Sequence, residues 1–166
     1  KAVGVSGKDG HLIEAGKKSH EGGIDLGFVG EINKVNPELL MVLLKQGFLP
    51  VVSPIGLGKD GITYNINADT TASRIAVSLG AYKIIFMTDV DGVMEKGKLC
   101  AQLTSNEVEN MINKKVISGG MEPKVDAALY CVKNGVESAQ IINGTEPHSV
   151  IAELFTDQGI GTKIVL

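Results

Sequence analysis

The six residues KIIFMT at positions 83–88 decide the fold of this 166-residue chain. Four consecutive apolar residues stand at their centre, which is typical of a parallel β-strand that helices cover on both faces. The polar segment DVDG, at positions 89–92, follows directly. The sequence therefore predicts a buried strand that ends in a polar loop.

Strand-like and helix-like patterns alternate on both sides of this stretch. Further strands are expected at 2–6, 11–15, 28–35, 48–55, 139–142 and 163–165. Helices are expected to begin near Pro37, Asp69, the T-S-N-E capping box at 104–107, Pro123 and Pro147. The first two strands are predicted to form a hairpin around GKDG, and residues 17–27 a surface loop. The alternation predicts an α/β fold with a largely parallel sheet.

The composition is that of an ordinary globular domain, with 43% hydrophobic and 21% charged residues. A net charge of −3 offers no basic surface for nucleic acid, and no apolar run approaches the ~18 residues of a membrane helix. Cys100 and Cys131 lack metal-ligand spacing, so no metal site is expected and the cytoplasm is the default compartment. Because the chain starts inside a strand-like pattern at Lys1, we expect a fragment of a longer protein.

The first polar cluster is YNINAD, positions 64–69. In an extended backbone Asn65, Asn67 and Asp69 project from one face. Amides both donate and accept hydrogen bonds, so this face suits a small polar ligand, and a helix start beside Asp69 suits an anion. The alternative is structural: Asp69 caps the helix and the asparagines are turn residues.

Two further clusters stand where ligands bind in α/β sheets, at the carboxyl ends of strands. TDVDGV, positions 88–93, is either a nucleotide-contacting loop or a plain turn; no Walker or Gly-x-Gly-x-x-Gly motif occurs. SGGMEPK, positions 118–124, puts Lys124 in the first turn of a helix, where a cation opposes the helix dipole. Phosphates bound at that helix end would make the lysine favourable, although a solvated surface lysine is the commoner case.

Five segments occur in order along the chain: GFVGEI (27–32), YNINADT (64–70), TDVDGV (88–93), GGMEPKVDAAL (119–129) and ELFTDQGIGT (153–162). With them the sequence resembles the amino acid kinase family and, within it, the acetylglutamate kinases. The resemblance covers the whole chain but only the carboxyl-terminal portion of those enzymes. Their amino-terminal phosphate loop with its catalytic lysine, their Gly-Gly turn and their substrate arginine have no counterpart here.

The resemblance implies an open, mostly parallel sheet sandwiched between helices, with its amino-terminal part missing. Residues 1–80 would be the distal part of the acetylglutamate-binding lobe, and residues 81–166 the nucleotide-binding lobe. The implied reaction moves the γ-phosphoryl group of ATP, with Mg²⁺, to the side-chain carboxylate of N-acetyl-L-glutamate in arginine biosynthesis. The chain by itself is expected to be inactive and to bind ATP weakly, while the parent enzyme is expected to be a cytoplasmic homo-oligomer.

The resemblance also assigns roles to single residues. Asn65 and Asn67 would contact acetylglutamate, and Asp69 would orient the catalytic Lys124. The implied ATP contacts are Asp89, Val90, Asp91, Gly92, Val93, Met94, Val116, Ile117, Ser118 and Met121. The segment that resembles the L-arginine feedback site of some members contains His148, Glu153, Thr156 and the ending Gly159-x-Gly161-Thr162.

Two other kinds of function stay open at this point. The chain could be a non-catalytic nucleotide- or arginine-binding module, which the missing upstream elements favour for the fragment alone. Glutamate 5-kinase, aspartokinase and uridylate kinase are rivals within the family. The paired asparagines before Asp69 speak against these three.

Overall fold

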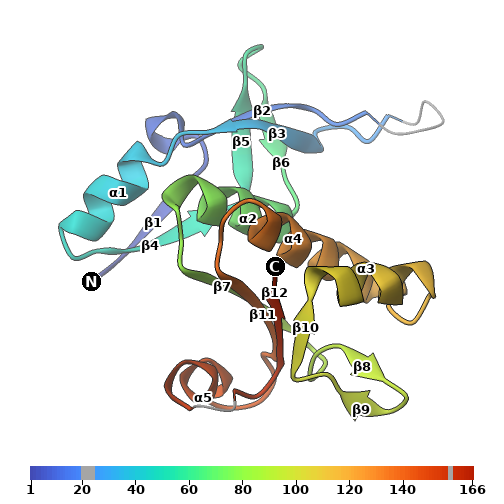
Figure 1. Ribbon diagram of the computed structural model, residues 1–166. Helices are drawn as coiled ribbons and strands as arrows, with labels where there is room; N and C mark the ends of the chain where they lie inside the picture. The colour runs from blue at the N-terminus through green and yellow to red at the C-terminus, as the bar shows by residue number, and fades with distance from the viewer. Residues whose placement is uncertain (20–24, 157–158) are drawn as a thin grey trace. The chain divides into compact units, whose positions relative to one another are not determined.

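The computed structural model describes residues 1–19, 25–156 and 159–166. These residues form two compact units, Lys1–Leu79 and Gly80–Leu166 (Figure 1), and each unit is described by itself. Residues 20–24 of the loop expected at 17–27, and positions 157–158 of the ELFTDQGIGT segment, lie outside the described residues.

The first unit is built on a four-stranded sheet in the order β3-β2-β5-β6. Its strands are β2 (Ile13–Lys17), β3 (Gly30–Val35), β5 (Ile55–Gly58) and β6 (Thr63–Asn65). Strand β2 pairs antiparallel with β3 and parallel with β5, and β6 closes an antiparallel hairpin with β5. Helix α2 (Ala68–Leu79) follows β6 and packs against β3.

The predicted hairpin of the first two strands is wrong. Strand β1 (Ala2–Ser6) instead pairs parallel with β4 (Leu49–Ser53), and Val3 lies opposite Pro50. The reason is local: a 3-10 turn, η1 (Asp9–His11), follows β1, and the Asp9 carboxylate accepts a hydrogen bond from the Ser6 backbone N–H (2.7 Å). The turn sends the chain into the other sheet. Helix α1 (Glu38–Lys45) then links β3 to β4.

The single strand expected at 48–55 is two strands, β4 and β5, which belong to different sheets. Pro54 stands between them, since proline has no N–H for a sheet ladder. Its carbonyl accepts a hydrogen bond from the Ile66 N–H (2.9 Å), which ties the break to the chain after β6. Directly after it, Gly56 packs so closely that an added Cβ would lie 2.7 Å from the Ala15 Cβ.

The core of the first unit lies between this sheet and helices α1 and α2. It consists of Leu12, Ile13, Ala15, Leu40, Tyr64 and Ile66. The buried Tyr64 hydroxyl donates to Asp60 Oδ2 (2.7 Å) in the β5–β6 turn, which locks the hairpin that leads to Asn65. The same hydrogen bond is the main cause that lowers the pKa of Asp60 and raises the pKa of Tyr64.

The second unit contains a four-stranded sheet in the order β10-β12-β11-β7. Strands β7 (Lys83–Thr88) and β11 (Ser138–Asn143) are parallel, as are β10 (Gln102–Thr104) and β12 (Thr162–Val165), but β12 runs antiparallel to β11. The strand predicted at 83–88 is confirmed to the residue. The α/β class is confirmed as well, with sheets that are mixed.

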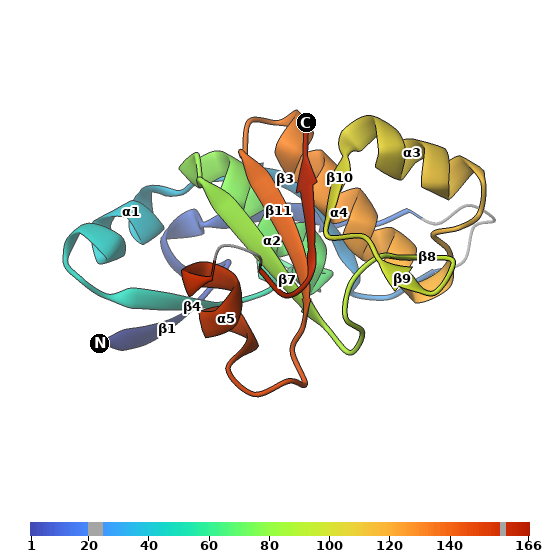
Figure 2. The ribbon, with the colours of Figure 1, turned by 60° about the horizontal axis from the view of Figure 1, so that its bottom comes forward.

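Helices cover both faces of this sheet. Helix α4 (Glu122–Lys133) packs against β7, β11 and β12, and α5 (Ser149–Phe155) contacts β11 from the opposite side (Figure 2). Strand β11 is consequently buried over residues 138–142. A small hairpin of β8 (Met94–Glu95) and β9 (Lys98–Leu99), which the sequence did not predict, follows the loop after β7. None of the helices in the described ranges is long and apolar enough to cross a membrane.

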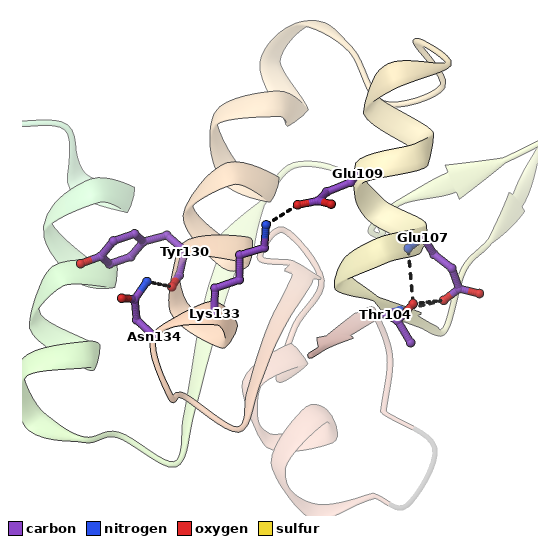
Figure 3. A network of polar contacts seen from close by, with 6 residues as sticks. All are labelled: Thr104, Glu107, Glu109, Tyr130, Lys133 and Asn134. Carbon is purple, nitrogen blue, oxygen red and sulfur yellow. Dashed lines mark hydrogen bonds and ion pairs between the residues drawn. The ribbon is translucent and has the colours of Figure 1, made fainter.

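Helix α3 (Ser105–Asn113) lies beside α4, and an ion pair between Glu109 and Lys133 joins the two (Figure 3). The predicted capping box at its start is confirmed. The Thr104 hydroxyl accepts from the Glu107 N–H (3.3 Å), and the Glu107 carboxylate accepts from the Thr104 N–H (2.8 Å). The Thr104 backbone N–H, followed by its hydroxyl, lowers the pKa of Glu107.

The capping box generates a stability prediction. Thr104→Ala should lower the free energy of unfolding of the second unit by about 1 kcal/mol, because the first turn of α3 loses its side-chain acceptor. Thr104→Ser keeps the oxygen and serves as the matched control. Urea denaturation followed by circular dichroism measures both variants, and equal loss in Ala and Ser would contradict the cap.

The pH dependence of this cap follows from Glu107. Because the folded pKa is lowered, the carboxylate stabilises the fold above its ordinary pKa of 4.5, and this stabilisation disappears as the pH falls through the folded pKa. The stability difference between the wild-type chain and Glu107→Gln should therefore be largest above pH 5 and shrink in more acidic buffer.

Candidate functional site

The first candidate cluster follows β6 in the first unit. Asn65 ends the strand, its backbone N–H donates to the Phe28 carbonyl (2.8 Å), and its side chain is exposed. The side-chain oxygen of Asn67 accepts from the Thr70 N–H (2.9 Å) and hydroxyl (3.2 Å). Asn67 is therefore the residue that caps α2, and Asp69 stands half-buried in the first turn of that helix.

This geometry separates the two interpretations of YNINAD. The structural role predicted for Asp69, capping the helix, falls to Asn67 instead. Asn65, Asn67 and Asp69 gather around the amino end of α2, where backbone N–H groups and the helix dipole favour a bound anion. The side-chain oxygen of Asn67 already accepts a hydrogen bond from the first turn of α2. The side-chain NH₂ group of Asn67 is therefore the part that can donate to a ligand.

The second candidate cluster is the loop at 89–94, at the carboxyl end of β7. Gly92 in this loop has φ +144°, in the region that favours glycine. The loop is fixed by neighbouring strands on the same edge of the sheet. Three hydrogen bonds do this: Gly144 N–H to Thr88 O (2.7 Å), Asn143 Nδ2 to Asp91 Oδ1 (2.9 Å) and Val93 N–H to Thr162 Oγ1 (2.8 Å).

The third cluster precedes α4. After α3, Val116 is exposed and Ile117 is buried, and Ser118 leads into a 3-10 turn, η2 (Gly119–Met121). Lys124 and Met121 are half-buried, with Lys124 in the first turn of α4. Because α4 leads directly into the parallel strand β11, its amino end lies toward the edge where β7 and β11 end (Figure 2). The second and third clusters therefore face the same edge of the second unit.

The predicted effector residues come together only in part. Glu153 is buried on α5, and its carboxylate accepts from the Ile160 N–H (3.0 Å). An added Cβ at Gly161 would lie 2.1 Å from the Ile141 carbonyl, so this position has no room for a side chain. Gly159 has φ +60°, and an added Cβ there would lie 2.7 Å from the Glu153 carboxylate, so glycine is favoured there as well. His148 is exposed at the other end of α5, with φ +63°, away from the turn.

A cleft of about 250 Å³ lies beside this turn, and sequence reasoning missed part of its lining. Strand register places Gln102, Lys163 and Gln140 in one row across three neighbouring strands. Gln140 is 3% exposed, and its Oε1 has no hydrogen-bond partner within the described part of the chain. The available signal was a glutamine that directly precedes the apolar residues Ile141 and Ile142 in the strand. The cleft is lined by Lys83, Ala101, Gln102, Gln140, Glu153, Thr156, Gly159, Gly161 and Lys163.

Metal ligands are not grouped in the described ranges: no cluster of three or more His, Cys, Asp or Glu side chains occurs there. Cys100 and Cys131 are both free thiols. Burial is the main cause that raises the pKa of the Cys100 thiol.

The chain is similar to curated acetylglutamate kinases. It is 52% identical to the one from Halothermothrix orenii, over 99% of this chain and 58% of that protein. It is also 52% identical to the one from Archaeoglobus fulgidus, over 99% of this chain and 60% of that protein. The chain thus spans about three fifths of the length of these relatives.

Solved structures of other enzymes share the fold. N-acetylglutamate synthase from Neisseria gonorrhoeae, complexed with coenzyme A and L-arginine, superposes with a TM-score of 0.84 at 30% identity, over 97% of this chain and 37% of that one. Isopentenyl phosphate kinase superposes with a TM-score of 0.67 at 22% identity, over 99% of this chain and 59% of that one, and shows likeness of fold alone. The amino acid kinase family matches residues 1–143, which is most of the chain, so this protein belongs to the amino acid kinase family.

Proposed function

We propose that this chain is part of an acetylglutamate kinase, which transfers the γ-phosphoryl group of ATP to the side-chain carboxylate of N-acetyl-L-glutamate. The observation that carries the proposal is the 52% identity to acetylglutamate kinases over 99% of the chain. The polar clusters at the amino end of α2 and at the edge of the second sheet support it, because they offer groups for both substrates. The enzyme would serve arginine biosynthesis in the cytoplasm.

The two units would hold different substrates. Asn65 and Asn67 would bind acetylglutamate, whose amide and carboxylates match the donors and acceptors of asparagine side chains. Asp69 would orient Lys124. Lys124 would place its ammonium group against the phosphates at the amino end of α4.

The second unit fits a nucleotide. An added Cβ at Gly119 or Gly120 would meet nothing within 4 Å, so the backbone before α4 is open to a close-approaching phosphate. The adenosine end would contact the loop at 89–94 and residues 116–118, with Met121 near the adenine. Mg²⁺ would be held mainly by the phosphates themselves, since the described residues present no acidic cluster for it. When bound, Mg²⁺ supplies further positive charge.

The proposed chemistry needs positioned charge rather than a general base. The attacking carboxylate of acetylglutamate is already ionised at neutral pH. Its oxygen forms a bond to the γ-phosphorus while the bond from that phosphorus to the β–γ bridging oxygen breaks, and ADP leaves. Negative charge spreads over the transferred group in this transition state, and a fixed ammonium such as that of Lys124 stabilises it.

We also propose that the cleft beside Glu153 binds L-arginine as a feedback effector. The buried Gln140 Oε1 and the Glu153 carboxylate suit the N–H groups of arginine, while Lys83 and Lys163 suit its carboxylate. The likeness to an N-acetylglutamate synthase complexed with L-arginine supports this assignment. The enzyme is further proposed to be a homo-oligomer, because α1 exposes Met41, Val42 and Leu44.

A second candidate function is a non-catalytic arginine-binding module. The likeness to a synthase complexed with L-arginine, at 30% identity over 97% of this chain, supports the arginine-binding part of this candidate. A chimera separates the two candidates: this chain replaces the matching segment of the Halothermothrix orenii relative, and acetylglutamate phosphorylation is measured. Activity near that of the relative supports the kinase, while a folded chimera that binds arginine without transferring phosphate supports the module.

Lys124 provides the first functional prediction. In the chimera, Lys124→Ala should lower kcat on the order of 10²–10³-fold, with a smaller effect on acetylglutamate binding, because one charge contact of the transition state is lost. Lys133→Ala removes an exposed lysine from the last turn of the same helix and is the control. A kcat close to wild type for Lys124→Ala would refute the assigned role.

Asn65 provides the second functional prediction. Asn65→Ala should raise the KM for acetylglutamate about tenfold, because a hydrogen bond worth about 1.5 kcal/mol is lost, and leave the KM for ATP nearly unchanged. Asn110→Ala, at an exposed position of α3, is the control. If the KM for ATP rose instead, Asn65 would belong with the nucleotide.

The third functional prediction concerns the 166-residue chain assayed by itself. It should bind ATP weakly and form no measurable acyl phosphate, because Lys124 is the one lysine in the described ranges proposed to oppose the phosphates. A hydroxamate assay, run beside the chimera, measures the acyl phosphate. Turnover by the chain near the rate of the chimera would contradict this expectation.

A further inference from the structure

We infer that Thr162 is a positioning residue for the loop at 89–94: its buried hydroxyl fixes the backbone of Val93 and thereby the place of the nucleotide contacts. This inference rests on the proposed function, which gives the loop its ligand. Thr162 opens β12, far along the chain from β7. The resemblance gave it only a place at the end of the arginine segment, with no role toward the loop at 89–94.

The contact itself is a hydrogen bond shut off from water. The Val93 N–H donates to Thr162 Oγ1 at 2.8 Å, and the two residues are 1% and 0% exposed. No solvent reaches the N–H, so water cannot replace the hydroxyl as its acceptor. Removing the oxygen would leave a buried donor unsatisfied, which the loop can correct only by moving.

The loop has little freedom around this contact. An added Cβ at Gly92 would lie 2.6 Å from Thr162 Oγ1, so the backbone passes directly beside the hydroxyl. The carbonyl of Val93 is also used, since it accepts from the Cys100 N–H (2.9 Å). Both backbone polar groups of Val93 thus have a hydrogen-bond partner. The acceptor for its N–H is Thr162, which belongs to strand β12.

The direction of β12 explains why a hydroxyl stands here. Because β12 is antiparallel to β11, its first residue lies at the edge where β7 ends. The backbone of Thr162 pairs with Ile141, and its side chain reaches the loop. If Thr162 served only to fill the core, valine would have the same shape and no polar atom to bury. A buried threonine at this place indicates that its oxygen is used.

The test compares Thr162→Val, Thr162→Ser and Thr162→Ala in the chimera defined above. Val keeps the shape and loses the acceptor, while Ser and Ala are both smaller and differ by one oxygen. Titration calorimetry with ATP should show binding about tenfold weaker for Val and Ala, and within about twofold of wild type for Ser. The KM for acetylglutamate should stay unchanged in all three. Hydrogen exchange should become faster at 89–94 in Val and Ala, but not in β2 of the first unit.

Other outcomes overturn the inference. ATP binding by Thr162→Val and Thr162→Ala that equals wild type would show that the hydroxyl does not position the loop. Weakening by Ser equal to that by Ala, or faster exchange throughout the chimera, would mean a general packing effect. If Val does not fold, the Ser and Ala pair decides. A wild-type chimera that binds no ATP would overturn the proposed function and this inference together, whereas failure of the inference alone leaves wild-type binding intact.

Discussion

The second unit depends on one constraint: the backbone of the buried strand β11 must find hydrogen-bond partners on both of its edges. Parallel pairing with β7 satisfies one edge and antiparallel pairing with β12 the other. These pairings bring the ends of β7 and β11 and the start of β12 to one edge of the sheet. The loop after β7 can then be held from two neighbouring strands, through Asn143 and Thr162. The position of this loop is thus set by sheet register together with the loop's own residues Asp91 and Gly92.

Much of the fold could be predicted where the signal was local. The apolar run of β7 and the capping box of α3 each depend on residues that are close together in the sequence, and the structure confirms both. Pairing partners are not local. The hairpin predicted for the first strands failed because the Asp9 turn directs β1 toward β4, more than forty residues away. The division of residues 48–55 at Pro54 had a visible signal, the proline itself, but no sequence pattern says that the two halves enter different sheets.

The candidate site, like the fold, could be predicted from the sequence only where the signal was local. The polar clusters could be found because asparagine, aspartate and glycine stand out at strand ends, as at Asn65 and Gly92. Which asparagine or aspartate caps α2 depended on where the helix begins, and the structure gives that role to Asn67. Gln140 was missed, and Thr162 was not connected with the loop at 89–94, because the rule of carboxyl strand ends ignores antiparallel strands and sheet faces. Their roles depend on neighbours that only strand register supplies.

Pro50 in β4 has a consequence for how the chain behaves at high concentration. Successive N–H groups of a strand point to alternate edges, and the Leu49 N–H donates toward β1, to the Lys1 carbonyl (2.8 Å). Position 50 therefore faces the edge of β4 turned away from β1, and proline removes one donor from that edge. Leu49 and Val51 expose apolar side chains on the same strand, and apolar side chains beside a strand edge favour pairing with another strand. Pro50 acts as a gatekeeper there, because an incoming strand meets a gap in the ladder where it needs a hydrogen bond.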